Sequence, residues 1–307
     1  MNVVLRRGTR AALRAWARTG RASGWFYRTV EHLGPALAEA TPIATVLPNG
    51  CRVSCDLRDH VQRQIFFFGV YEPVLASLFV RLLRPGMTVV DGGANVGQYT
   101  LLAAFGVGAT GSVHSFEPVP HTFERLTAHV RANGLTNVHA NRVALWNEST
   151  ELTLGLADDQ ENNAGAYSAG VRDSTSSFTA SAIRLDDYCA QRDITRVHLV
   201  KLDVEGAELQ ALHGMQQILE RDRPVVFVEV CRETASRFGY DHAETWKYLV
   251  DGLGYAAWVV RDGELQSVQH DEVREQENVL FAVEAPAIDA HVLAPRGALR
   301  WAASGHD

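Results

Sequence analysis

A glycine-rich turn between two apolar segments limits the fold of this chain more than any other feature. The segment Val89–Gly97 reads Val-Val-Asp-Gly-Gly-Ala-Asn-Val-Gly, and apolar residues continue on both sides of it. This pattern is typical of a strand that enters a buried helix through a tight turn. Strand and helix patterns go on alternating to about residue 285. Alternating elements with unbroken apolar strands indicate a doubly wound α/β fold, in which helices cover both faces of a mostly parallel sheet.

Seven strands and four helices are expected in this region. The strands are Met87–Asp91, Ser112–Glu117, Val138–Leu145, Val197–Asp203, Pro224–Val230, Tyr255–Val260 and Asn278–Val283. The helices are Val96–Phe105, Thr122–Asn133, Glu208–Leu219 and Glu244–Leu253. Ligands of such sheets bind at the carboxyl ends of the strands, so functional polar residues are to be sought there.

Three zones divide the chain. Residues 1–60 form a basic arm with two short strands, Ile43–Leu47 and Cys51–Leu57, around a Pro-Asn-Gly turn. Residues 61–285 form the α/β domain, and residues 286–307 are an Ala/Pro-rich tail that we expect to be loosely attached. Within the domain, the polar segment Gly155–Ala180 is long for a loop, and we interpret it as a lid or substrate loop rather than a passive insertion.

Charge is distributed unevenly. The first 30 residues hold seven arginines and no acid, whereas the whole chain has 29 basic and 36 acidic residues, which leaves the rest with 22 against 36. An acidic body excludes general nucleic-acid binding, because neutralising phosphates requires a basic face. The arm is interpreted as a lid or a dimer element in preference to a contact with an anionic membrane surface.

The composition also favours a compartment. Basic residues are almost all arginine, with lysine only at Lys201 and Lys247, as in bacterial genomes of high GC content. The N-terminus lacks the apolar core of a secretory signal, so we expect a cytoplasmic protein with reduced thiols. A single Cys-x3-Cys pair, Cys51 and Cys55, is weak evidence for a metal, and Cys189 and Cys231 fit core positions.

The residues of the glycine turn distinguish between two possible ligands, a dinucleotide and S-adenosylmethionine. A dinucleotide requires Gly-x-Gly-x-x-Gly and places its pyrophosphate on the helix N-terminus, but Asn95 takes the place of the second glycine. Asp91 would also repel a pyrophosphate, whereas it would attract an ammonium or a sulfonium group. S-adenosylmethionine carries both cations and no phosphate. The pattern Asp91-x-Gly93-x-Asn95-x-Gly97 therefore favours S-adenosylmethionine.

Two further acidic patterns follow at strand ends. Glu117 lies 20 positions after Gly97 and before a proline, which is where a ribose diol is bound in related folds. Lys201, Asp203 and Glu205 alternate with apolar residues and thus project to one side of an extended segment. Such a group is costly to bury without partners, which indicates a functional cluster, with a helix-capping salt-bridge cluster as the alternative.

Metal binding is the weaker interpretation of these carboxylates. Glu229 ends the strand expected beside that of Asp203, and the two could hold a divalent cation. Two carboxylates without a third ligand are weak evidence, so no metal is assigned.

With these motifs, the chain resembles the FkbM family of S-adenosylmethionine-dependent methyltransferases. The matching pieces cover roughly residues 65–283 in the order that the family has them, and the first 60 residues lie outside the resemblance. One departure is Gly92, at a position where an aliphatic residue is common. The pieces are Gly69–Pro73, Asp91–Gly97, Phe116–Pro118, Val143–Leu145, Leu185–Asp187, Lys201–Glu208 and Glu277–Val279.

The resemblance implies a fold and a chemistry. It implies a Rossmann-like sheet of seven strands, the last antiparallel, and methylation of a hydroxyl on a sugar, lipid or secondary metabolite. The turn residues Asp91, Gly93, Asn95 and Gly97 would line the methionine part of the cofactor. Glu117 would bind the ribose, and Ala144 would lie near the adenine. Asp203 would lie beside the methyl group.

A hydroxyl nucleophile must also lose its proton, and a nearby carboxylate can take it. Asp203 or Glu205 is our candidate for that base, with Lys201 orienting the acceptor or tuning the carboxylate. Two other functions stay open at this point: an NAD(P)-dependent oxidoreductase, and a non-catalytic module that binds an adenosine ligand.

Overall fold

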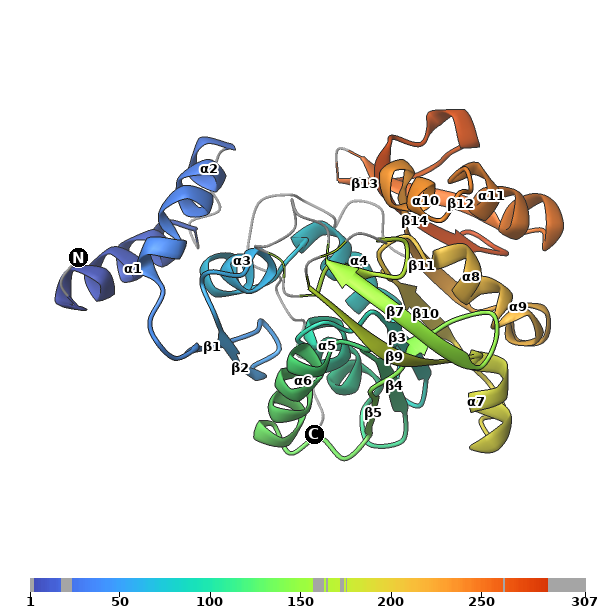
Figure 1. Cartoon of the computed structure of the whole chain (residues 1–307), viewed down its shortest axis with the longest axis horizontal. Coiled ribbons are helices and arrows are strands. Elements are labelled where there is room, and N and C mark those ends of the chain that lie inside the picture. The colour runs from blue at the N-terminus through green and yellow to red at the C-terminus, as the bar shows by residue number, and fades with distance from the viewer. Residues whose placement is uncertain are drawn as a thin grey trace.

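The computed structural model describes residues 3–17, 24–156, 163, 165–171, 174, 176–261 and 263–286. An eight-stranded sheet with the order β13-β12-β14-β11-β10-β3-β4-β5 lies at its centre (Figure 1). The strands are β3 (Thr88–Gly92), β4 (Ser112–Phe116), β5 (Val138–Asn141), β10 (Leu199–Leu202), β11 (Val225–Cys231), β12 (Ala256–Arg261), β13 (Glu264–Ser267) and β14 (Gln276–Ala282).

The strand directions confirm the doubly wound fold. Strands β5, β4, β3, β10 and β11 pair in parallel, and β14 is inserted between β11 and β12, antiparallel to both. Each of the seven expected strands therefore has a counterpart in this sheet, although one is shorter than expected, and the last one is antiparallel. An eighth strand, β13, forms a hairpin with β12 at the sheet edge. Its four residues include a single apolar one, Leu265, so the sequence carries no periodic signal for it.

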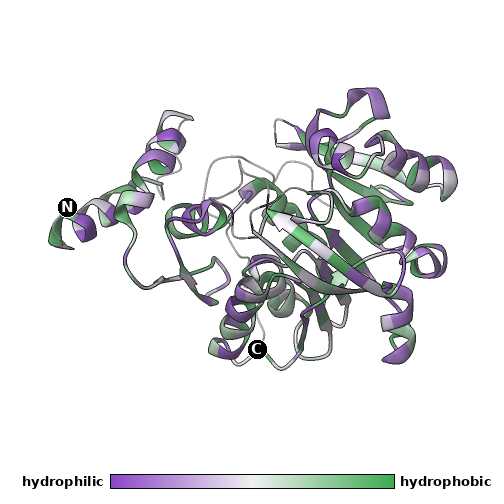
Figure 2. Cartoon of the chain, viewed as in Figure 1, coloured by the Kyte–Doolittle hydropathy of each residue, from purple (hydrophilic) through white to green (hydrophobic). Residues whose placement is uncertain are grey.

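Alternate residues of the strands enter two different cores, as the pleat of a sheet requires. Val90, Val200 and Val228 are buried on one face with Trp246 and Phe281. The other face buries Val89, Leu199 and Phe227 among a second set of apolar residues. Figure 2 shows the resulting concentration of hydrophobic residues in the central strands. Burial on both faces explains why these strands are apolar without a break.

Helices follow the strands, and one expected helix is divided. They are α4 (Pro73–Leu82), α5 (Gln98–Val107), α6 (Pro120–Ala132), α7 (Leu185–Gln191), α8 (Glu208–His213), α9 (Gln216–Asp222), α10 (Arg232–Arg237), α11 (Ala243–Trp246) and a π-helix at Lys247–Gly252. Expecting a single helix over Glu208–Leu219 was wrong. Helix α8 ends before Gly214, which packs against the Trp146 backbone: a Cβ atom there would lie 1.9 Å from the carbonyl oxygen of Trp146.

A second sheet, β6-β9-β7-β8, lies beside the carboxyl ends of the central strands. Its strands are β6 (Ala144–Leu145), β7 (Thr150–Leu156), β8 (Tyr167–Ser168) and β9 (Ser177–Ile183). The single strand expected over Val138–Leu145 was wrong, because β5 and β6 belong to different sheets. The segment expected to be an irregular loop contributes β8 and the ends of β7 and β9; positions 157–162, 164, 172, 173 and 175 lie outside the described residues.

The N-terminal region precedes the domain with helices and a hairpin. It contains α1 (Val3–Ala17), α2 (Gly24–Leu33), a 3₁₀ turn at Pro35–Leu37, the hairpin of β1 (Ile43–Val46) and β2 (Arg52–Cys55), and α3 (His60–Phe68). The two expected short strands are confirmed. One core cluster unites Leu13 and Phe26 of the arm with Phe67 of α3 and Leu101 of α5. The division at residue 60 stays a prediction, and the tail from 287 lies outside the described residues.

Within the described residues, no single helix has the length and apolarity to cross a membrane. Helices α3 and α4, bent by 76° at their junction, meet that criterion only when they are counted together.

Candidate active site

The glycine turn after β3 lies directly against the segment that follows β10. A Cβ atom at Gly93 would lie 1.8 Å from the carbonyl oxygen of Asp203, and Gly93 has φ +74°, which favours glycine. The N–H groups of Gly93 and Ala94 both donate to the carbonyl of Phe116 at 3.0 Å. The turn therefore joins the carboxyl ends of β3, β4 and β10 into one floor.

Asn95 and Gly97 of the same turn lie in different places. Asn95 has φ +49°, its Oδ1 accepts a hydrogen bond from the N–H of Val96 (2.7 Å), and it lines the larger of two cavities described below. Gly97 caps the start of α5 with φ +95°, and a Cβ there would lie 2.5 Å from Cδ1 of Leu126. Gly97 shapes the turn from behind and lines neither cavity.

Glu117 is held at the end of β4 by the backbone. Its Oε2 accepts from the N–H of Asn95 (2.8 Å) and its Oε1 from the N–H of Val119 (2.9 Å). Burial raises the pKa of its carboxyl to about 7, although both hydrogen bonds act in the opposite direction. These bonds fix the carboxylate beside the turn, where it lines both cavities.

Asp91 lies beneath that floor and is fully buried. Thr100 donates to its Oδ2 (2.6 Å) and also contacts the Ser115 hydroxyl (2.7 Å). Within the described part of the chain, Asp91 Oδ1 has no hydrogen-bond partner. Burial raises the pKa of the Asp91 carboxyl, and nearby Lys201 acts against that rise. An unsatisfied buried carboxylate oxygen favours a cationic group nearby.

Lys201 is the buried cation of the site. Its Nζ donates to Oδ2 of Asp203 (3.0 Å) and lies 4.7 Å from the centre of the Tyr99 ring, close enough for a cation–π contact. Burial lowers the pKa of the ammonium, but Asp203, Asp91 and Glu72 outweigh burial and raise it. The β-ladder pairs Lys201 with Asp91 on the neighbouring strand. The ammonium is therefore charged and holds Asp203 in place.

Glu205 completes the group that the sequence predicted. It adopts a left-handed backbone, φ +55°, before Gly206, and Ser168 donates to its carbonyl (2.8 Å). Burial, followed by the negative charges of Asp203 and Glu208, raises the pKa of its carboxyl to about 8. The structure therefore brings Lys201, Asp203 and Glu205 together, and both carboxylates line both cavities.

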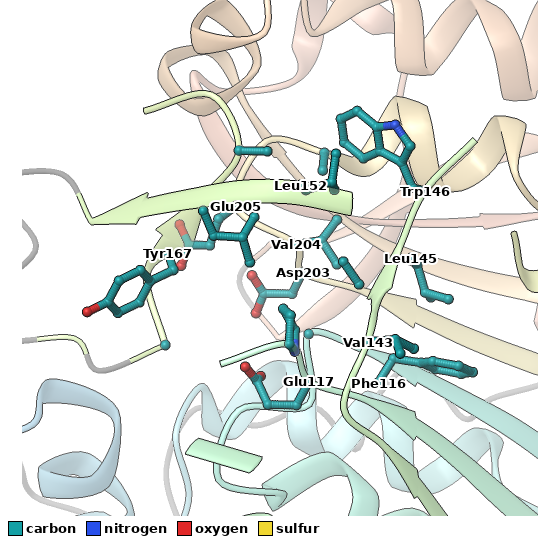
Figure 3. A pocket seen from close by; sticks show the side chains of 17 residues that line it. Phe116, Glu117, Val143, Leu145, Trp146, Leu152, Tyr167, Asp203, Val204 and Glu205 are labelled. Carbon is teal, nitrogen blue, oxygen red and sulfur yellow. The ribbon is translucent and has the colours of Figure 1, made fainter. Parts of the chain in front are cut away.

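Two adjoining cavities meet at these carboxylates. The narrower, about 50 Å³, is mostly apolar, and Ala144, Leu145 and Trp146 line its wall. Figure 3 shows Glu117, Asp203 and Glu205 around one space, with Leu145 and Trp146 on its far side. The larger cavity, about 260 Å³, is polar and extends over the turn to α3 and α10. One apolar slot and one charged chamber suit a ligand with an aromatic end and a cationic end.

The sequence analysis missed Glu72 and Tyr99. Glu72 precedes α4 with φ +50°, and its carboxylate accepts hydrogen bonds from Asn278 (2.8 Å) and from Tyr99 (3.4 Å). Burial and the charge of Asp203 raise the pKa of Glu72. The only signal in the sequence is the pattern Tyr71-Glu72-Pro73, in which a proline restricts the residue before it.

Glu229 lies at the same end of the sheet but has another partner. Gln276 donates to its Oε1 (2.9 Å), and burial followed by the charge of Asp203 raises the pKa of the Glu229 carboxyl well above its usual value. Among the residues that the structure describes, no three His, Cys, Asp or Glu side chains are grouped so that they could hold a metal ion.

Comparison with known proteins gives a consistent result. The profile of the methyltransferase FkbM domain matches residues 91–257, which is more than half of the chain. The 31-O-demethyl-FK506 methyltransferase FkbM of Streptomyces tacrolimicus is 32% identical over 167 residues, covering 44% of this chain and 61% of the relative. The hexuronic acid methyltransferase AglP of Haloferax volcanii is 30% identical over 131 residues, 42% of this chain and 50% of the relative.

The chain is also similar to solved structures. The methyltransferase FkbM of Methylobacillus flagellatus superposes with a TM-score of 0.42 at 14% identity, covering 73% of this chain and 55% of that one. The match therefore spans only part of each of these proteins.

Proposed function

Because the chain belongs to the FkbM family of methyltransferases, we propose that it transfers the methyl group of S-adenosylmethionine to a hydroxyl group of a small acceptor. The family decides against the NAD(P)-dependent oxidoreductase considered above. The observation that carries the proposal is the excess of carboxylates over cations around one cleft, which suits a doubly cationic cofactor. Relatives that methylate a natural product and a hexuronic acid support a sugar, lipid or secondary metabolite as the acceptor.

The residues fit this cofactor in two respects. Gly93 has no side chain and lines both cavities, so a ligand can approach the backbone of the turn, and Asp91 has a buried oxygen without a partner among the described residues. In our proposal Asp91 and Asn95 attract the methionine end, Glu117 binds the ribose hydroxyls and Ala144 packs on the adenine. Gly93 and Gly97 keep the turn in its shape.

When bound, S-adenosylmethionine would supply a methyl group on a sulfonium: the acceptor oxygen bonds to the methyl carbon in line as the bond from that carbon to sulfur breaks, and S-adenosylhomocysteine leaves. The protein's task is to position the acceptor oxygen and to take its proton. Glu205 is suited to accept that proton, because a pKa of about 8 lies close to neutral pH. Asp203, oriented by Lys201, would align the acceptor hydroxyl or share the role of the base.

Paired variants test these roles. We expect Asp203→Asn and Glu205→Gln to lower turnover by roughly 10²–10⁴-fold, the contribution of a general base, and to lower cofactor affinity far less. Asp187→Asn, an exposed carboxylate on α7, is the control and should change neither. Equal losses in turnover and in calorimetric affinity would assign Asp203 or Glu205 to cofactor binding instead. Mass spectrometry and NMR of the product identify the methylated atom.

A further inference from the structure

The N-terminal helix α1 has its apolar and charged faces reversed relative to an ordinary surface helix. The face that the protein covers carries arginines: Arg6 donates to the Ala38 carbonyl (3.1 Å), Arg10 to the Leu37 carbonyl (3.0 Å) and to Glu39, and Arg14 to the Thr45 hydroxyl (2.7 Å). Arg14 also stacks on the ring of Phe66 at 4.5 Å. These contacts bind α1 firmly to the rest of the protein.

The opposite face of α1 is exposed and almost entirely apolar. Its residues recur every three or four positions, as one face of a helix requires, and Arg7 is the only charged residue among them. The exposed positions are Val4, Leu5, Arg7, Gly8, Ala11, Ala12, Ala15 and Trp16.

Helix α2 continues this exposed surface. Trp25 is 65% exposed, and its ring lies 5.9 Å from that of Trp16. Leu33 is 45% exposed farther along the helix. We call the surface formed by Leu5, Trp16, Trp25 and Leu33 the apolar stripe. Large apolar side chains that are exposed on two adjoining helices, with two tryptophans side by side, mark an interaction site, because protein surfaces in water normally avoid such groups.

Charge decides what covers the stripe. Exposed Arg7 and Arg28 flank it, and no acidic residue precedes Glu31 in the chain. A second copy of the arm would bring like charges together, whereas an anionic lipid surface would attract the arm and repel the acidic remainder of the protein. Tryptophan side chains are also favoured at the boundary between head groups and acyl chains.

From the apolar stripe and its charges, we infer that α1 and α2 dock the protein on an anionic membrane surface, with α1 lying in the interface. Figure 1 shows both helices standing out beside α3, on the opposite side of the domain from β13. Glu31 of α2 contacts His60 (3.0 Å), and His60 lines the larger cavity. Docking would thus bring a membrane-borne acceptor close to that cavity.

Vesicle flotation of the full chain tests the inference. We expect binding to vesicles of phosphatidylcholine mixed with phosphatidylglycerol, weakening with salt, and little binding to phosphatidylcholine alone. The double variant Leu5→Glu, Trp25→Glu should abolish binding. Arg7→Gln and Arg28→Gln should each weaken it roughly fivefold, as for about one unit charge at an anionic surface. Val283→Glu is the matched control, because Val283 is also exposed (46%) but lies outside the arm.

Folding is checked in each variant by S-adenosylmethionine binding, which should equal that of the unchanged protein. The inference is wrong if the unchanged protein does not bind anionic vesicles. It is also wrong if the Leu5→Glu, Trp25→Glu variant binds them as tightly as the unchanged protein. Light scattering that shows a dimer lost in the same double variant, without vesicle binding, would make the stripe an interface between two copies and would also refute the inference.

Discussion

Replacing Gly93 by alanine is the sharpest single test of the site, because it adds one atom at the point where the two turns touch. The new Cβ would lie 1.8 Å from the carbonyl oxygen of Asp203 and 2.8 Å from its carbonyl carbon. Since contacts under 3.0 Å are essentially never seen for real Cβ atoms, one of the two turns must move by more than 1 Å. Asp203 would then shift relative to Lys201, its partner at 3.0 Å.

Two costs add up in this variant. An alanine at φ +74° costs about 1–2 kcal/mol because of the left-handed backbone. Forcing an extra methyl group into a packed site costs about 1–3 kcal/mol more. We therefore expect a loss of roughly 2–5 kcal/mol in the free energy of unfolding. Because Gly93 also lines both cavities, S-adenosylmethionine affinity should fall to an undetectable level.

Gly134→Ala separates these two costs. Gly134 also has a positive φ, +62°, but nothing lies within 4 Å of a Cβ built there. The Gly134→Ala variant should lose only about 1–2 kcal/mol in the free energy of unfolding and keep its cofactor affinity. Urea unfolding gives the stabilities and calorimetry the affinities. If Gly93→Ala matched Gly134→Ala in both measurements, the turns would not pack as described and the reasoning would be refuted.

Two further predictions concern the buried charges. Burial raises the pKa of Glu117 to about 7 and that of Glu205 to about 8, both above the unfolded value of about 4.5, so the folded ligand-free protein takes up protons that the unfolded chain has released. Its unfolding free energy, measured in urea, should therefore fall as pH rises from about 6.5 to about 8, above the range in which buried histidines such as His114 lose their protons, while S-adenosylmethionine affinity rises. A stability that increases over this range would contradict the assignment. Lys201→Met removes the ammonium that faces three carboxylates and should cost about 3–5 kcal/mol at neutral pH. Lys247 is the other lysine and is exposed, so Lys247→Met should change the free energy of unfolding by less than about 0.5 kcal/mol. Equal effects of the two substitutions would show that Lys201 does not pair with buried carboxylates.

The sequence predicted those parts of the fold and site that local pattern encodes. Strand β3 and its turn were recognisable because unbroken apolar residues end in an acid and three glycines. The same reasoning located Glu117 and the group from Lys201 to Glu205, because each follows an apolar strand directly. Parallel strands then bring their carboxyl ends together without further information.

What the sequence did not reveal depends on contacts between distant segments. Glu72 precedes the first strand of the sheet, yet its partner Asn278 lies 206 positions later. The division between β5 and β6 is equally tertiary: Ala144 leaves the central sheet because it pairs with Ala182 of β9. Arg10 and Arg14 show the same limit, since an arginine-rich helix is ordinarily expected to turn its charges toward solvent.

The excess of negative charge in and around the two cavities links stability to cofactor binding. Glu72, Asp91, Glu117, Glu205 and Glu229 all have raised pKa values, chiefly because burial penalises their charged forms. Lys201 is the buried cation among them, while Arg237 at the cavity rim pairs with Glu233. Without a ligand, the protein relieves this excess by holding protons, at a cost in stability as the pH rises. A sulfonium and an ammonium would provide the missing charge and release those protons. The arrangement that weakens the ligand-free fold is therefore the one that favours a cationic methyl donor over neutral or anionic nucleotides.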